Sequence, residues 1–249
     1  GAADGPTSIF VANELGSKYI GAIMVAAYSY MALVPIVQPP VIKAVTTKKE
    51  RLIRMKYNPG EVSKTTKILF PIVVTVIAGL VAPKSVALVG FLMFGNLIRE
   101  CGVLNNLSET AQNSFANIIT ILLGITVAGQ MHYEEFVKPA TLLILGLGLV
   151  AFVFDTIGGV LFAKFLNLFL PKEKKINRVE EWLSVAVLIN PMIGAAGISA
   201  FPMSGRVVNQ MGLKEDNQNF LLMQSISVNV SGQIASVIAG GLILTLVAK

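Results

Sequence analysis

Cysteine and histidine are almost absent from this chain of 249 residues, which holds one of each. A single cysteine, Cys101, excludes an intramolecular disulfide framework and a cysteine-rich metal site, and we expect it to pack as a small apolar residue. The single histidine, His132, follows an apolar run and precedes acidic residues, so we interpret it as an interfacial side chain. A two-histidine metal site and a catalytic triad are therefore excluded.

Charged side chains are also scarce, at 14% of the residues, whereas 54% are hydrophobic and the mean hydropathy is +0.70. These values lie outside the usage of soluble domains. Several apolar runs are long enough, or nearly so, to cross roughly 30 Å of hydrocarbon, namely residues 17–37, 68–83, 113–130, 140–168 and 220–248. The sequence predicts an all-α membrane protein, a polytopic helical bundle with five to seven spans.

The net charge of +6 does not indicate a nucleic-acid partner, because the basic residues lie in two short loops between apolar spans. The first loop is within residues 43–67 and the second within 172–178. The positive-inside rule places both loops in the cytoplasm, which requires an even number of crossings between them. Four crossings fit if residues 86–98 form a span. We expect a multi-pass protein of the cytoplasmic (inner) membrane.

Two segments rich in glycine, proline and small polar residues interrupt the apolar pattern, at residues 1–7 and 190–202. Both contain Gly-Ala-Ala, a following polar residue and a nearby proline. Such a pair is typical of inverted-repeat transporters, whose broken, re-entrant helices expose carbonyls to an ion. We expect one membrane domain, residues 1–249, with repeat portions 1–100 and 101–249. Two glycine-rich interfacial loops are the alternative interpretation.

Three ionisable residues fall at membrane depth, where each is a functional candidate because of its insertion cost. Asp4 lies in the first interruption beside Thr7 and Ser8, where a carboxylate, hydroxyls and freed carbonyls can replace the water shell of a hard cation. Asp155 is either a hydrogen-bonding partner or a proton carrier. Arg206 follows the second interruption, where it either binds a carboxyl group or extends to the interface.

Neutral oxygen donors also occur in apolar sequence, at Asn190, Ser199 and Asn229. Sodium prefers such ligands, although a lone buried asparagine commonly serves helix packing. Tyr28 and Tyr30 lie within the first full span, where they either belong to an aromatic belt or face a cavity with the hydroxyl available to an ion or proton.

Four segments closely resemble the beta subunits of sodium-translocating, biotin-dependent decarboxylases that act on oxaloacetate, methylmalonyl-CoA or glutaconyl-CoA. These segments are Gly1-Ala-Ala-Asp-Gly-Pro-Thr7, the tyrosine- and proline-rich residues 27–40, Thr46-Thr-Lys-Lys-Glu-Arg51 and the Asn-Pro motif of residues 190–203. The resemblance runs over essentially the whole chain.

The resemblance implies that carboxybiotin is decarboxylated at the membrane with consumption of a proton, and that this reaction drives sodium outward. It assigns the catalytic role to Asp4, Ser199 and Arg206. It assigns sodium binding to Asp4, Tyr30, Asn190, Gly194, Ser199 and Asn229. Asp4 must be deprotonated to bind sodium, so ion and proton compete for one carboxylate.

The resemblance also implies partners. These are an alpha carboxyltransferase subunit, a biotin carrier subunit that bears the biotin, a small membrane subunit, membrane lipid and further copies of this chain. The acyl substrate is chosen by the carboxyltransferase subunit.

The chain departs from the family pattern in two places. Family members have further membrane segments before the Asp-Gly-Pro motif, so the resemblance implies an N-terminally incomplete chain. Residues Arg178 to Ile189 resemble an insertion of about one helix. The alternative functions are a sodium-coupled secondary transporter of small carboxylates, which needs no biotin, and a truncated chain that only inserts.

Overall fold

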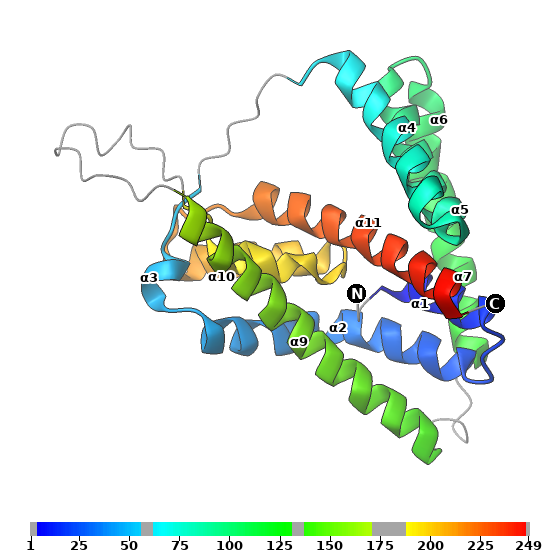
Figure 1. The fold of residues 1–249 in the computed structure, drawn as a ribbon, viewed down its shortest axis with the longest axis horizontal. Coiled ribbons are helices and arrows are strands. Elements are labelled where there is room, and N and C mark those ends of the chain that lie inside the picture. The colour runs from blue at the N-terminus through cyan, green and yellow to red at the C-terminus, as the bar shows by residue number, and fades with distance from the viewer. Residues whose placement is uncertain (1–3, 56–61, 131–136, 171–187, 248–249) are drawn as a thin grey trace. The chain divides into compact units, whose positions relative to one another are not determined.

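The computed structural model describes residues 4–55, 62–130, 137–170 and 188–247, and within these ranges every regular element is helical (Figure 1). The first half contains α1 (Gly5–Glu14), α2 (Ile20–Val45), α3 (Lys48–Arg51), α4 (Lys64–Val81), η1 (Pro83–Ser85), α5 (Val86–Cys101), α6 (Asn105–Thr110) and η2 (Ala111–Phe115), a π-helical turn. The second half contains α7 (Ala116–Gln130), α9 (Pro139–Phe169), η3 (Pro191–Ile198), α10 (Met203–Glu215) and α11 (Leu222–Val247). The all-α prediction is confirmed.

Four helices in the described ranges are long and apolar enough to cross a membrane. They are α2 and α11 with 26 residues each, α4 with 18 and α9 with 31. Their outward side chains are apolar and exposed, as at Leu80, which is 79% accessible, and Leu168, which is 77% accessible. So much exposed apolar surface suits lipid and not water. The length and composition of these helices and their exposed apolar surface thus support the prediction of a membrane protein.

The chain forms two compact units, each assembled from segments that are far apart in the sequence. The first unit comprises residues 1–4, 27–58 and 146–233, and the second comprises 5–26, 59–145 and 234–249. The predicted repeat portions, which divide the chain near residue 100, stay a prediction.

The second unit is built on the α4–α5 hairpin. Ala78 from α4, Val89 and Met93 from α5 and Val237 from α11 form a buried apolar cluster. Gly240 of α11 also meets α1, because a Cβ there would lie 2.8 Å from the Thr7 methyl group. Small residues thus let the helices of this unit approach closely, as is common in membranes.

The first unit contains the interruption predicted for residues 190–202. Asn190 caps a 3₁₀ segment, η3, which begins at Pro191 and ends at Ser199 with a left-handed backbone (φ 61°). Proline favours a helix start, whereas the residues from Ser199 to Pro202 leave helical geometry before α10 begins at Met203. Most of η3 is buried. A broken segment is tolerated at membrane depth only when protein surrounds it in this way.

Glycine pairs bring two long helices directly against the η3 backbone. A Cβ on Gly159 of α9 would overlap the carbonyl oxygen of Gly194, and a Cβ on Gly232 of α11 would overlap that of Gly197. Any side chain at these positions must therefore displace η3. Gly158, the neighbour of Gly159, has no atom within 4 Å of its hypothetical Cβ.

We predict that Gly159→Ala lowers the unfolding temperature of the purified protein in detergent, because overpacking against a rigid backbone costs about 1–3 kcal/mol. Gly158→Ala is the matched control and should leave the unfolding temperature unchanged or slightly raise it, since alanine favours helix. Equal unfolding temperatures for the two variants would contradict the close contact.

Candidate functional site

Five buried polar side chains of the first unit surround η3, and they come from three different parts of the chain. Gln38 belongs to α2, Asn190, Ser199 and Ser204 belong to the interrupted segment and the start of α10, and Asn229 belongs to α11. Each is at most 3% accessible. Buried polar groups are costly unless they are bonded, so their partners define what the site can do.

Asn190 uses both ends of its carboxamide to join η3 to the loop after α3. Its oxygen accepts a hydrogen bond from the Met192 N–H at 3.0 Å. Its nitrogen donates to the carbonyl oxygens of Arg51 at 3.1 Å and Ile53 at 2.8 Å. The structure therefore places this predicted sodium ligand as a clamp, and its role as a ligand stays a prediction.

The loop that Asn190 holds is fixed by further bonds. Asn219 donates to the Arg51 carbonyl at 2.9 Å. The Arg51 guanidinium pairs with Glu215 at 2.7 Å, and Arg54 pairs with Asp216. At the residue before Asn190, Asn167 of α9 exchanges two 2.8 Å hydrogen bonds with the backbone of Ile189. These bonds fix the start of η3 and the loop that it contacts.

Asn229 and Ser199 lie at the other end of η3. The Asn229 nitrogen donates to the Ala196 carbonyl at 2.8 Å, which places this α11 side chain on the interrupted segment. The Asn229 oxygen and the Ser199 hydroxyl are buried and have no hydrogen-bond partner within the described ranges. Ser199 also adopts the left-handed region that non-glycine residues rarely occupy. Backbone strain of this kind commonly marks functional positions.

Gln38 is a site residue that sequence reasoning missed. Its nitrogen donates to the Ala195 carbonyl at 2.8 Å and to the Ser204 hydroxyl at 2.7 Å. Its oxygen is buried and, among the described residues, accepts no hydrogen bond. The available signal was an amide in an apolar span directly before Pro39 and Pro40.

The chemistry of these groups matches a hard monovalent cation. Five buried side-chain oxygens lack hydrogen bonds in the described ranges, and three of them, from Gln38, Ser199 and Asn229, belong to side chains that lie on or bond to residues 195–199. The other two are on Asn219 and Ser225. Among the residues that the structure describes, no group of three or more His, Cys, Asp or Glu side chains could hold a metal. Neutral oxygens without imidazole or thiolate favour an alkali ion over a transition metal.

Asp4 and the two tyrosines also belong to the first unit. Asp4 directly precedes α1 and is 3% accessible, and Tyr28 lies within electrostatic reach of its carboxylate. Tyr30 is buried with its hydroxyl against Gly148 of α9, where a Cβ would overlap the ring. Asp4 thus lies near Tyr28, whereas Tyr30 packs on a neighbouring helix.

The remaining predicted residues are distributed differently. Gly194 is the contact point of η3 with α9. The side chains of Arg206 on α10 and Asp155 on α9 are exposed in the single chain. Cys101 is a free, half-buried cysteine that donates to the Ile98 carbonyl. His132 and all but the last two residues of the segment 178–189 lie outside the described residues.

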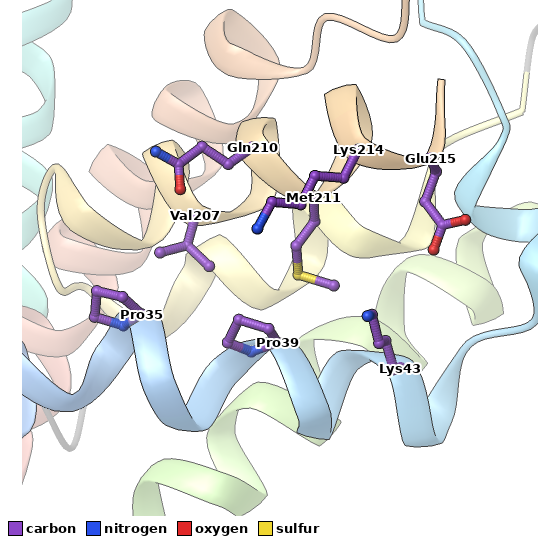
Figure 2. A pocket seen from close by; sticks show the side chains of 8 residues that line it. All are labelled: Pro35, Pro39, Lys43, Val207, Gln210, Met211, Lys214 and Glu215. Atoms are coloured by element: carbon purple, nitrogen blue, oxygen red, sulfur yellow. The ribbon is translucent and has the colours of Figure 1, made fainter. Parts of the chain in front are cut away.

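A separate pocket of about 240 Å³ lies between α2 and α10 (Figure 2). Pro35 and Pro39 form its floor on α2, and the side chain of Lys214 runs back along α10 toward Val207. Lys43 adds a second ammonium group. None of the predicted sodium ligands lines this pocket.

The comparisons with known proteins place the whole chain in one group. The family model of the Na⁺-transporting oxaloacetate decarboxylase beta subunit matches residues 1–247. The chain belongs to this family.

Individual relatives agree with the assignment. The chain is 50% identical over 246 residues to the methylmalonyl-CoA decarboxylase subunit beta of Propionigenium modestum, with 99% of this chain and 58% of the relative covered. It is 48% identical over 244 residues to the oxaloacetate decarboxylase beta chain of Klebsiella pneumoniae, with 98% and 53% covered. The chain thus spans a little more than half the length of these curated relatives.

The hydrogen bonds of the Asn190 side chain lead to a testable prediction. Asn190→Asp keeps an oxygen for the Met192 cap but removes the donors to two carbonyls. The Ile53 carbonyl is left unpaired, at a cost of about 1–3 kcal/mol, whereas the Arg51 carbonyl still accepts from Asn219. We expect a lower unfolding temperature in detergent than for Asn219→Asp, which affects only the Arg51 carbonyl. A smaller loss in Asn190→Asp than in Asn219→Asp would contradict the clamp.

A second test uses Glu50, which lies outside the membrane-spanning helices. Burial opposes its ionisation, but bonds from Thr47 and an ion pair with Lys164 at 2.9 Å outweigh this and lower the pKa of Glu50. A lowered pKa contributes stability that is present above the unfolded-state pKa and is lost as the pH falls through the folded-state pKa. The contribution of Glu50 should therefore vanish below the ordinary carboxyl range.

We predict that Glu50→Gln lowers the unfolding temperature at about pH 7 and that the difference from the wild type shrinks toward about pH 3.5. Glu109→Gln, at an exposed carboxylate of α6, is the control and should give a smaller difference at neutral pH. If the difference in unfolding temperature between Glu50→Gln and the wild type grew as the pH fell, the lowered pKa of Glu50 would be refuted.

Proposed function

We propose that this chain is part of a membrane subunit that couples the decarboxylation of carboxybiotin to sodium export. The observation that carries the proposal is that three of the five buried side-chain oxygens without hydrogen bonds in the described structure, on Gln38, Ser199 and Asn229, belong to side chains on or bonded to η3 and its C-cap. Such groups cost free energy unless a ligand occupies them. The family description, which names sodium transport, supports the identity of that ligand.

In the proposed mechanism Asp4 is the exchanging group. Its deprotonated carboxylate binds sodium, and a proton that displaces the ion neutralises the same oxygen atoms. Burial of Asp4 strengthens this competition, because a low-dielectric site does not retain a charge without a counter-charge. The neutral oxygens near η3 replace water around the ion without adding charge.

Carboxybiotin enters this scheme as a substrate carried by a separate biotin carrier subunit. Its decarboxylation consumes one proton, since the ureido nitrogen takes up a proton when the bond to the carboxyl carbon breaks and carbon dioxide leaves. The exposed guanidinium of Arg206, on the helix after η3, is suited to hold the departing carboxylate. The Ser199 hydroxyl, at the end of η3, is the second proposed catalytic group.

The proposal includes the partners and location that the family implies. An alpha carboxyltransferase subunit, a biotin carrier subunit and a small membrane subunit complete the complex, several copies of this chain assemble, and the location is the cytoplasmic membrane. The exposed apolar faces of α4, α5 and α9 supply surface for lipid or for neighbouring subunits. The relatives are named for different acyl substrates, in keeping with a choice made by another subunit.

The test is carbon dioxide release from carboxybiotin by the complete subunit, with its partners, in proteoliposomes. We predict that sodium stimulates this release and that Asp4→Asn abolishes the stimulation, because an amide can neither release a proton nor neutralise the ion. Asp155→Asn, a matched change at an exposed membrane carboxylate, should retain most of the activity.

Loss of activity in Asp155→Asn with normal activity in Asp4→Asn would move the exchanging carboxylate to α9. Sodium movement that leaves carboxybiotin untouched would instead establish the sodium-coupled carrier of small carboxylates.

A further inference from the structure

The position of Gln38 needs a functional explanation, because a fully buried carboxamide in an apolar helix is costly. Gln38 has 0% accessible surface and lies in the C-terminal half of α2. Its nitrogen is satisfied by two acceptors, the Ala195 carbonyl and the Ser204 hydroxyl. Its oxygen is not satisfied within the described ranges. An apolar side chain of the same size would avoid the cost of that unbonded oxygen.

The orientation of this carboxamide is fixed by its neighbours. The Ala195 carbonyl can only accept hydrogen bonds, and the Ser204 hydroxyl donates its single proton to that same carbonyl at 3.2 Å. Both groups that face the end of Gln38 are therefore acceptors. If the amide were inverted, its oxygen would face the Ala195 carbonyl oxygen, which offers no donor. The nitrogen must face η3, and the oxygen must point away from these two groups.

Asn229 repeats this arrangement from the opposite helix. Its nitrogen donates to Ala196, the residue after the one that Gln38 binds, and its oxygen is also buried and unbonded among the described residues. The Cα atoms of adjacent residues are about 3.8 Å apart. Two carboxamides, one from α2 and one from α11, are thus anchored at neighbouring positions of one segment.

The α2 backbone supplies further oxygen atoms beside Gln38. Pro39 and Pro40 have no N–H, so the carbonyls of Pro35 and Ile36 lack the helical bond that would otherwise come from four residues on. Carbonyls freed in this way are characteristic of ion sites in broken membrane helices. Together with Ser199, the local chemistry consists of neutral oxygens, which suits a hard cation of low charge.

We propose that Gln38 is a direct ligand of the transported cation, which it binds through Oε1 while its Nε2 holds η3. The identity of the ion as sodium rests on the proposed function. Gln38 then performs two tasks with one side chain. The nitrogen fixes the interrupted segment, and the oxygen, which accepts no hydrogen bond among the described residues, is the ligand.

Direct sodium binding separates this role from simple anchoring. Radioactive sodium binding to the complete subunit with its partners, without carboxybiotin, gives a readout that does not depend on catalysis. Gln38→Met keeps the length of the side chain and removes its oxygen, so the sodium Kd should rise about tenfold or more. The rise of the unfolding temperature on addition of sodium should shrink in parallel.

Two control variants isolate the oxygen. Ser204→Ala removes one of the two acceptors that anchor Gln38, and because the Ala195 carbonyl still holds the amide, we expect the sodium Kd to rise less than in Gln38→Met. Gln224→Met makes the same replacement at an amide that donates to the Met55 carbonyl, and it should leave the Kd nearly unchanged. Gln38→Asn, which withdraws the oxygen by one methylene, should weaken sodium binding if Gln38→Met does not fold.

The outcomes distinguish this inference from the proposed function. Equal sodium Kd values for Gln38→Met and the wild type would refute Gln38 as a ligand while leaving the sodium site intact. An equal loss in Gln38→Met and Ser204→Ala would reduce Gln38 to an anchor and also refute the inference. If the wild-type complex binds no sodium, the proposed function itself fails.

Discussion

A chain that leaves α-helical geometry inside a membrane must satisfy its backbone hydrogen bonds without water. The first unit is organised around this requirement at residues 190–199. Carboxamide side chains provide the solution. Asn190 caps the segment, and Gln38 and Asn229 bind two of its carbonyls from different helices. Each carboxamide carries a donor and an acceptor, so each bond that a nitrogen makes to η3 positions an oxygen nearby. In the proposed sodium site, the structural need and the supply of cation ligands therefore have the same origin.

Close backbone packing makes this arrangement rigid. The glycine contacts of α9 and α11 with Gly194 and Gly197 leave no space for side chains, so these helices fix the position of the segment to within van der Waals contact. The loop after α3 is held from the same side through the Arg51 and Ile53 carbonyls. A site for a small ion needs this precision, because sodium is distinguished from other ions by the distances between its oxygen ligands.

The sequence predicted the features that depend on local composition, and it missed those that depend on distant contacts. Apolar length predicted the spanning helices, and the proline and glycine content of residues 190–202 predicted the interruption. Asn190, Ser199 and Asn229 were found because polar residues are conspicuous in apolar sequence. Gln38 was missed because its partners Ala195 and Ser204 lie 157 and 166 residues away. The clamp role of Asn190 depends likewise on carbonyls 137 and 139 residues distant.

The backbone of Ser199 has a consequence for attempts to engineer this protein. A serine with φ of 61° is less stable than a glycine would be, since only glycine enters this region without steric cost. Selection for heat resistance alone would therefore favour glycine at position 199. Under the proposed role of Ser199, selection for ion transport would oppose it, because glycine has no hydroxyl to offer. The proposal therefore makes position 199 a point where robustness and activity conflict, and a thermostabilised variant that carries glycine there would exchange one for the other.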